Sequence, residues 1–363
     1  MTQANTELER EFSAAGCARA SWFVRAQNVP QTIAKLGLVG PSDRLVVRAN
    51  DFTAAYLRFF GTGTLTFAKD QTVEAFMDAT RASNHPAAGG PKEGHASYAD
   101  GAGARFDRLF WLVNSIGCRG LRVPDIRALA AAAREAGAIL IVDNTVASSW
   151  GCKPLALGAH IAFEALDRVA SGALAAKAVA ISVARSVTGR GRKQRTDELA
   201  HQAYCLLAQR LGGERSQLVF NVDGADLNII ENGLNTLAAR MQQHVDHARV
   251  IAEYLSAHPL VPRVCYPGLT SHPDHAIAAQ VLQHGFGPAV DFELPDSVTA
   301  GEFIEGCTCS GRPYPAGGAH TRMSALCGDE AHFIRLFAGL DDPIDIVDSL
   351  EQAMRLYCNP PHA

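Results

Sequence analysis

Residues 108–145, "RLFWLVNSIGCRGLRVPDIRALAAAAREAGAILIVDNT", determine the fold class of the larger part of the chain. A short apolar run is followed by an alanine-rich helical pattern ending at Gly137, and then by a β-branched run that ends in polar residues. This order predicts a βαβ unit with a right-handed crossover, hence a parallel sheet covered by helices. In such sheets functional groups lie just past the carboxyl ends of strands, which makes Asp143, Asn144 and Thr145 candidates.

A second landmark is a helical pattern over residues 226–259, in which apolar residues recur every three or four positions up to Pro259. Strand candidates and a closing helix follow at 261–268, 287–294, 333–340 and 343–357. They predict a smaller α/β domain at the C-terminus, reached through the long helix. The expected organisation is an N-terminal arm over 1–44, a large domain over 45–240 and a C-terminal domain over 241–363.

Two stretches have irregular composition. Residues 81–104 are rich in Gly and Ala and contain two prolines, which predicts a mobile surface loop. Residues 184–195 hold five basic residues around two glycines. A solvated basic loop is the favoured interpretation, because neither a P-loop pattern nor interleaved aromatic residues support an anion site there.

Composition excludes several classes of function. The 363 residues suffice for two domains, and 47% apolar with 19% charged residues is typical of a folded globular protein. A formal charge of -4 gives no reason to expect nucleic-acid or membrane partners. Charges near the N-terminus and the lack of a long apolar run predict a cytoplasmic protein. The nine cysteines lack metal-ligand spacing, so we expect reduced thiols and no metal site.

Several longer segments together carry a family resemblance. They are "VPDIRAL" (123–129), "IVDNTVAS" (141–148), "GLNTLAARMQQH" (233–244), "VCYPGLTSHPDH" (264–275) and "FIRLFAGLDDPIDIVDSLEQA" (333–353). In this order the chain resembles the trans-sulfuration, or Cys/Met metabolism, family of fold-type I pyridoxal phosphate enzymes, such as cystathionine synthases and lyases and methionine γ-lyase. The resemblance implies a fold-type I α/β fold, with a mainly parallel sheet in the large domain and a smaller C-terminal α/β domain. It also implies a homo-oligomer, dimer or tetramer.

The resemblance assigns roles to four residues. Asp143 matches the acid that faces the pyridine nitrogen and keeps it protonated, so that the ring withdraws electrons. Arg335 matches the arginine that holds the substrate carboxylate through its planar fork. Phe52 stands where the family has a tyrosine that stacks on the ring, and can stack but not transfer protons. Arg25 matches an arginine that reaches the phosphate in a neighbouring subunit.

The cofactor-binding motif departs from the family pattern. The family has a stretch like D-I-V-V-H-S-A-T-K-x-x-x-G, and "HIAFEALDRVASG" (160–172) places Arg168 at the lysine. A guanidinium keeps its proton, with a pKa above about 12, so it cannot form a Schiff base. Ala165 and Asp167 replace the two hydroxyl residues that hold the phosphate, and Asp167 would repel a dianion. Lys177 is nine positions away and does not fit the motif.

The N-terminal segment departs further. "WFVRAQNVPQTIAKL" (22–36) resembles the family's Y-S-R-x-x-N-P-T with Phe23 for the tyrosine, and the following phosphate-binding glycine turn has no counterpart. We therefore expect no covalently bound pyridoxal phosphate. The leading hypothesis is a homologue that keeps the scaffold but not the catalysis. Such a protein would bind an amino acid-like carboxylate through Arg335, or associate with an active paralogue through Arg25.

Two other interpretations stay open. One is a trans-sulfuration-type enzyme that holds pyridoxal phosphate non-covalently against Asp143 and Phe52. The other is cofactor-free chemistry in the old cleft, drawing on Arg168, Asp167, Glu164 and a histidine, either His160 or His320. A deep pocket with a carboxylate and a histidine within hydrogen-bond reach would favour the second.

Overall fold

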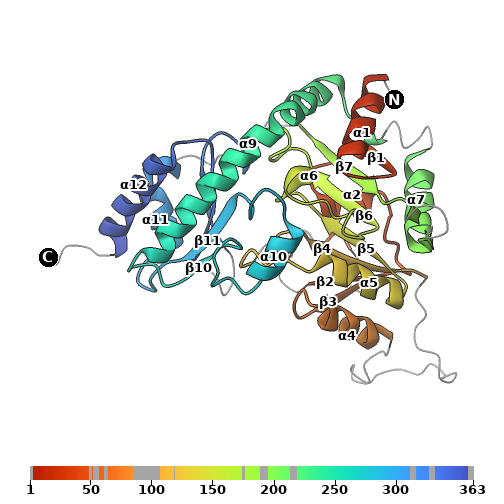
Figure 1. The fold of residues 1–363 in the computed structure, drawn as a ribbon, viewed down its shortest axis with the longest axis horizontal. Helices are drawn as coiled ribbons and strands as arrows, with labels where there is room; N and C mark the ends of the chain where they lie inside the picture. The colour runs from red at the N-terminus through yellow and green to blue at the C-terminus, as the bar shows by residue number, and fades with distance from the viewer. Residues whose placement is uncertain are drawn as a thin grey trace, which may run out of the picture.

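The computed structural model describes residues 3–48, 51, 57–60, 64–84, 107–117, 119–173, 176–188, 195–212, 219–310, 316–326 and 332–358. These residues form a seven-stranded and a four-stranded β-sheet joined by one long helix (Figure 1), together with a two-stranded antiparallel pair, β8 (Val187–Thr188) and β9 (Arg195–Thr196). No described helix is long and apolar enough to cross a membrane.

The larger sheet has seven strands and is mostly parallel. Its strands, in spatial order, are β1 (Ala20–Arg25), β7 (Ala178–Val183), β6 (Ile161–Ala165), β5 (Ala138–Asp143), β4 (Leu109–Asn114), β2 (Arg44–Arg48) and β3 (Leu65–Ala68). The five strands from β6 to β3 are parallel, and β7 is antiparallel to both of its neighbours. The predicted βαβ unit is confirmed: β4 and β5 are parallel neighbours on either side of α5 (Ile126–Ala136).

Helices cover both faces of this sheet. Alternate residues of β4 point to opposite faces: Trp111 joins the core under α5 and α4 (Val73–Asn84), and Phe110 joins the core under α2 (Val29–Lys35) and α7 (Glu198–Leu211). The central strands β2, β4 and β5 therefore contribute apolar side chains to two separate cores, which explains why they read as continuous apolar runs. Gly137 ends α5 in the left-handed conformation, with φ of 68°.

The smaller sheet has four antiparallel strands, ordered β10 (Val264–Cys265), β11 (Ala289–Glu293), β13 (Phe333–Phe337) and β12 (Arg322–Ala325). Its apolar face packs against the end of α9 (Gly224–Ala257), α11 (Ala300–Gly306) and α12 (Pro343–Ala353). The remaining short elements are α1 (Gln3–Ala15), α6 (Ser148–Gly151), α10 (His275–Val281), β8 (Val187–Thr188), β9 (Arg195–Thr196), a 3-10 turn (Thr308–Ser310) and a π turn (Met354–Cys358).

Several sequence predictions are refined by these elements. The long helix is confirmed as α9, and the boundary predicted at residue 240 falls inside it. The segment 1–44, predicted as an arm, contributes β1 to the larger sheet, because β1 pairs along its whole length with β7. Residues 81–84 belong to α4, and the rest of the 81–104 loop lies outside the described residues. Strand β12 has no counterpart among the predicted strands.

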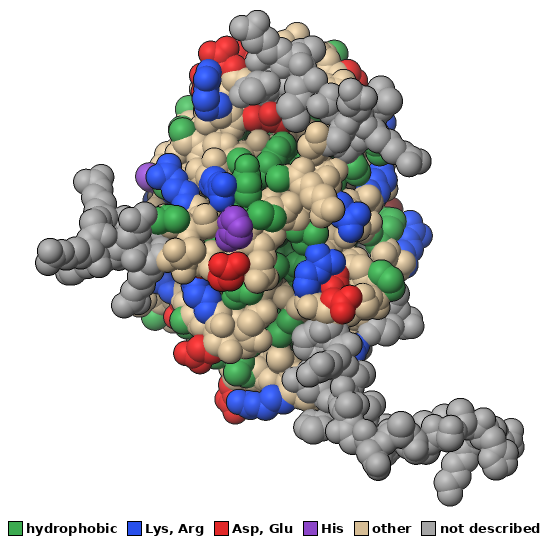
Figure 2. All heavy atoms as spheres, turned by 90° about the vertical axis from the view of Figure 1, so that its right-hand side faces the viewer, with side chains coloured by type: hydrophobic (Ala, Val, Ile, Leu, Met, Phe, Trp, Pro, Cys, Tyr) green, Lys and Arg blue, Asp and Glu red, His purple; other side chains and the backbone are tan. Residues whose placement is uncertain are grey.

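The charged side chains show no concentration of one sign on the face drawn in Figure 2. Basic and acidic side chains of the described residues are interspersed there with apolar ones. This distribution agrees with the small formal charge of -4 and offers no electrostatic footprint for a nucleic acid on that face.

Candidate functional site

A cavity of about 300 Å³ lies where the carboxyl ends of β4 and β5 meet the smaller sheet. We call it the Asp143 cavity; residues of its wall used below are Asn28, Asp143, Ala165, Arg168, Arg322 and Arg335. They come from the start of α2, the end of β5, the turn after β6, and strands β12 and β13. The cavity is thus built by both sheets, at the edge where the sequence predicts functional groups.

Asp143 is held rigidly at the end of β5. Its Oδ1 accepts hydrogen bonds from the backbone N–H of Thr145 at 3.0 Å and from the Thr145 hydroxyl at 2.6 Å. The Thr145 hydroxyl in turn accepts a hydrogen bond from the backbone N–H of Ala165 at 3.0 Å. Asp143 Oδ2 makes no hydrogen bond to a described residue, and burial raises the pKa of this carboxyl. One carboxylate oxygen is therefore available to a cationic or N–H group in the cavity.

A second carboxyl group, that of Glu164, is buried behind Asp143. Its Oε2 accepts a hydrogen bond from the backbone N–H of Ser149 at 2.9 Å, while Oε1 has no partner among the described residues. Burial, with a smaller contribution from the nearby Asp143 charge, raises the pKa of Glu164 to about 8. Glu164 is therefore a neutral carboxylic acid at pH 7, and it lies outside the wall of the Asp143 cavity.

Arg168 lies in the turn that follows β6 and reaches the Asp143 cavity. Its side chain is 36% exposed, and its Nε is 3.8 Å from Asp167 Oδ1, at the outer limit of an ion pair. Apart from this contact the guanidinium has no hydrogen-bond partner among the described residues. Arg168 can therefore present most of its donors to an anion in the cavity.

Arg335 reaches the same cavity but is already paired. Its Nε and Nη2 donate to the two oxygens of Asp291, both at 2.7 Å, and the side chains are 10% and 0% exposed. The two residues lie directly opposite each other on β13 and β11. This bidentate pair occupies two of the donors with which a guanidinium grips a carboxylate. The role of Arg335 in binding a ligand carboxylate stays a prediction.

Of the other predicted site residues, those that the structure describes lie outside the cavity wall. Arg25 ends β1 with an exposed side chain, and Phe52 lies outside the described residues. Lys177 is exposed just before β7 and is not part of the wall. Arg168 and Asp143 are therefore brought together in one cavity, with Arg335, whereas Arg25 is not.

Neither histidine considered for cofactor-free chemistry lines the Asp143 cavity. His160 is fully buried: its Nδ1 accepts the backbone N–H of Leu140 at 2.8 Å, and burial lowers its pKa to about 4. His320 has a 55% exposed side chain that pairs with Asp341 at 3.0 Å. A carboxylate and a histidine thus do not meet in the described part of this cavity, so the arrangement that would favour that interpretation is not found there.

Three residues of the site had no sequence prediction. Asn28 lines the cavity and caps α2, accepting the N–H of Gln31 at 2.9 Å, and Arg322 comes from the unpredicted strand β12. Asp291 pairs with Arg335 across the smaller sheet. Two of them have a usable signal: Asn28 falls on the asparagine of the N-terminal motif, and Asp291 is a carboxylate inside the apolar strand "AVDFE", which requires a buried partner.

Solved structures identify the fold. The chain superposes on a methionine γ-lyase from Micromonospora echinospora with a TM-score of 0.77, covering 98% of this chain and 87% of that one at 24% identity. A cystathionine γ-synthase from Xanthomonas oryzae gives a TM-score of 0.77 at 22% identity, with 98% and 86% covered. The fold is therefore the fold-type I α/β fold that the resemblance implies.

Sequence comparison identifies the family. The family described as Cys/Met metabolism PLP-dependent enzyme matches residues 107–325, and this chain belongs to it. A cystathionine γ-lyase from Sus scrofa is 30% identical over 253 residues, 65% of this chain and 57% of the relative. A cystathionine β-lyase from Lactococcus lactis is 32% identical over 185 residues, 51% and 43%. The chain thus spans about half the length of the curated relatives that it matches.

The residues of the cavity match only part of what pyridoxal phosphate needs. Asp143, with its available Oδ2, fits a protonated ring nitrogen. The described cavity wall includes no lysine, and Ala165 offers a methyl group where a phosphate needs a donor. A carboxylate, Asp167, lies beside Arg168 and would repel a dianion. The described residues therefore do not fit a covalently held cofactor with an anchored phosphate.

Proposed function

We propose that this chain binds a small amino acid in the Asp143 cavity without forming a Schiff base. The supporting observation is one cavity wall that carries opposite charges: the donors of Arg168 and the available Oδ2 of Asp143. An α-amino acid carries a carboxylate and an ammonium group on one carbon. Arg168 would hold the carboxylate, and Asp143 would hold the ammonium group.

The chemistry expected of this site is recognition. A guanidinium is neither a nucleophile nor a base, so Arg168 can neither attack a carbonyl nor accept a proton. Burial raises the pKa of Asp143, and an ammonium group beside it would favour its ionised form, so ligand binding and ionisation would support each other. Because relatives include cystathionine and methionine lyases, the ligands to test are L-methionine and L-cystathionine.

Calorimetric titration with L-methionine and L-cystathionine tests this proposal. We expect saturable binding that weakens about tenfold or more in Arg168→Gln and in Asp143→Asn, since each removes a charge-assisted hydrogen bond. Arg25→Gln is the matched control, because Arg25 is exposed and outside the cavity wall. Equal affinity in Arg168→Gln and the unmodified protein would contradict the assignment of Arg168.

A second measurement separates recognition from cofactor chemistry. The protein is mixed with pyridoxal phosphate, reduced with borohydride and weighed intact. We expect no mass increase, because the described cavity wall holds no lysine. A borohydride-stable adduct mapped to a single lysine, such as Lys177, would overturn the proposal and favour an enzyme.

A second candidate function rests on Arg25. Its side chain is exposed at the end of β1, an edge strand of the larger sheet, and has no ion-pair partner among the described residues. We infer that it could contact an active paralogue or a second copy of this chain across a subunit interface. Sedimentation of the protein alone and of Arg25→Glu tests this role: an association that survives the charge reversal would contradict it.

A further inference from the structure

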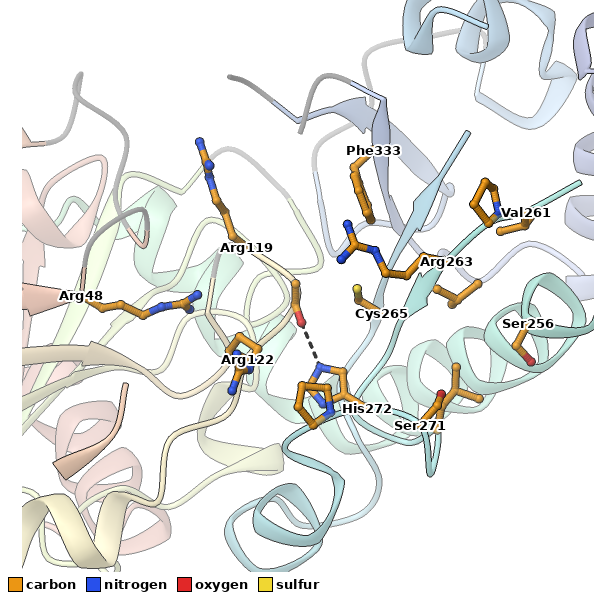
Figure 3. Close-up of a pocket in the computed structure, with 15 residues that line it drawn as sticks. Arg48, Arg119, Arg122, Ser256, Val261, Arg263, Cys265, Ser271, His272 and Phe333 are labelled. Atoms are coloured by element: carbon orange, nitrogen blue, oxygen red, sulfur yellow. Dashed lines mark hydrogen bonds between the residues drawn. The ribbon is translucent and has the colours of Figure 1, made fainter. Parts of the chain in front are cut away.

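A second and larger cavity of about 560 Å³ lies on the other side of the segment that follows β4. We call it the arginine cavity, because Arg48, Arg119, Arg122 and Arg263 line it. Arg48 ends β2, Arg119 and Arg122 follow β4, and Arg263 directly precedes β10 in the smaller sheet. Figure 3 shows Arg48 and Arg263 pointing toward the same space from opposite sides.

The wall of the arginine cavity has one sign of charge. No Asp or Glu is among its described lining residues. Three of these arginines pair with carboxylates outside the wall. Asp51 pairs with Arg48 at 2.8 Å and Glu293 pairs with Arg263 at 3.2 Å. Two donors of Arg122 are taken up by the two oxygens of Asp274, so Arg48 and Arg263 are the arginines on which anion recognition would chiefly depend.

Two of these arginines, Arg48 and Arg263, also keep donors that no described residue uses. Arg48 has an 11% exposed side chain, and its Nε is buried without a hydrogen-bond partner among the described residues. Arg263 donates only Nε to Glu293, so neither Nη group has a partner in the described part of the chain. Arg263 can therefore offer its Nη groups to an anion in the cavity.

His272 adds no charge to this cavity. Its Nε2 donates to the carbonyl of Gly120 at 2.9 Å (Figure 3). Its Nδ1 accepts the N–H of Asp274 at 3.1 Å. Both ring nitrogens are therefore engaged in the neutral form, and burial lowers the pKa of the imidazole. Recognition of an anion would depend on the arginines.

We propose that the arginine cavity binds a small organic phosphate. Guanidinium groups approach from opposite sides, and a tetrahedral phosphate offers oxygens in several directions whereas a planar carboxylate offers two in one plane. Val261, Leu269 and Phe333 add apolar wall, which suits an organic group beside the phosphate. The Cζ atom of Arg263 also lies 4.6 Å from the centroid of the Phe333 ring, and this cation–π contact helps to fix the position of the guanidinium.

Titration with phenyl phosphate, inorganic phosphate and benzoate tests the proposal. We expect saturable binding of phenyl phosphate that is tighter than that of the other two ligands. In Arg263→Gln the affinity should fall about tenfold, because a charge-assisted contact is removed, and Arg263→Lys should fall less. Arg263 is 60% exposed, so these variants should fold normally.

Two controls locate the ligand. Arg249→Gln removes an arginine of similar exposure, 56%, that pairs with Glu253 at 3.3 Å outside the cavity wall, and it should bind like the unmodified protein. Arg168→Gln tests the other cavity and should also have no effect. Absence of phenyl phosphate binding, tighter binding of benzoate, unchanged affinity in Arg263→Gln, or a loss in Arg168→Gln would each overturn the proposal.

Discussion

Strand β11 carries two carboxylates with contrasting roles. Asp291, whose partner is Arg335 in the Asp143 cavity, is 0% exposed and makes two hydrogen bonds of 2.7 Å. Glu293, two residues further along, is 29% exposed and makes one contact of 3.2 Å to Arg263 in the arginine cavity. In both pairs an arginine contacts a carboxylate of the same strand. The Asp291 pair is buried and has two hydrogen bonds, whereas the Glu293 pair is partly exposed and has one.

These two pairs show that an arginine in a cavity wall is not by itself a ligand site. Arg335 has the position that the family resemblance assigns to a carboxylate receptor, but Asp291 occupies two of its donors. Arg263 leaves both Nη groups unused by the described residues. The number of guanidinium donors that remain for a ligand depends on how deeply the partner carboxylate is buried and on whether it accepts one hydrogen bond or two.

The largest expected effect comes from breaking the buried pair. Asp291→Ala should lower the free energy of unfolding by about 4 kcal/mol, because it leaves a buried guanidinium without its carboxylate. Urea denaturation measures this change. Asp291→Ala combined with Arg335→Met should recover part of the loss. A loss below about 1 kcal/mol in the single variant would show that the pair behaves like a surface contact.

Glu164 is also a buried carboxyl, but unlike Asp291 it forms no ion pair with a described Lys or Arg. Its folded pKa of about 8 lies above the ordinary value, so between about pH 5 and 8 the folded state binds more protons than the unfolded state. Stability contributed by this group is therefore lost as pH rises. The free energy of unfolding of Glu164→Gln, relative to that of the unmodified protein, should therefore be roughly 3 kcal/mol higher at pH 8 than at pH 5.

Thermal or urea unfolding at the two pH values checks this difference. Glu231→Gln, at an exposed position on α9, supplies the control and should leave the pH dependence as it is. If Glu164→Gln and the unmodified protein lose stability in parallel from pH 5 to 8, Glu164 is not protonated in the folded state.

The smallest effect is expected at the exposed pair. Glu293→Ala should change the free energy of unfolding by less than about 0.5 kcal/mol, since a partly exposed ion pair gains little in water. Urea denaturation beside Asp291→Ala, on the same strand, makes the contrast direct. A loss comparable with that of Asp291→Ala would erase the distinction between the two pairs.

Much of the fold could be predicted because its signals are local. Each signal is formed by residues that are close together in the sequence. Examples are the apolar runs of β4 and β5, the left-handed Gly137 and the apolar repeat along α9. Strand β12 escaped prediction because its four residues alternate weakly, and only pairing with β13 makes them a strand. The edge position of β1 likewise depends on β7, more than 150 residues away.

The sequence predicted those residues of the site that can be recognised from their own position in a strand or motif. Asp143 follows from its place at a strand end, and Arg168 from its place in a motif. The pairing of Arg335 with Asp291, 44 residues apart, follows from the register of two strands that no local pattern fixes. The arginine cavity likewise collects residues from β2, from the segment after β4 and from the entry to β10, which only the folded chain brings together.

Helix α9 has a mechanical consequence for the whole molecule. At 34 residues it is about 50 Å long. Its first half buries Leu227 and Ile230 in the core beside the larger sheet, and its second half buries Ile251 and Leu255 in the core of the smaller sheet. Because both cores pack on one continuous helix, we expect α9 to couple the unfolding of the two halves and to oppose a hinge between them.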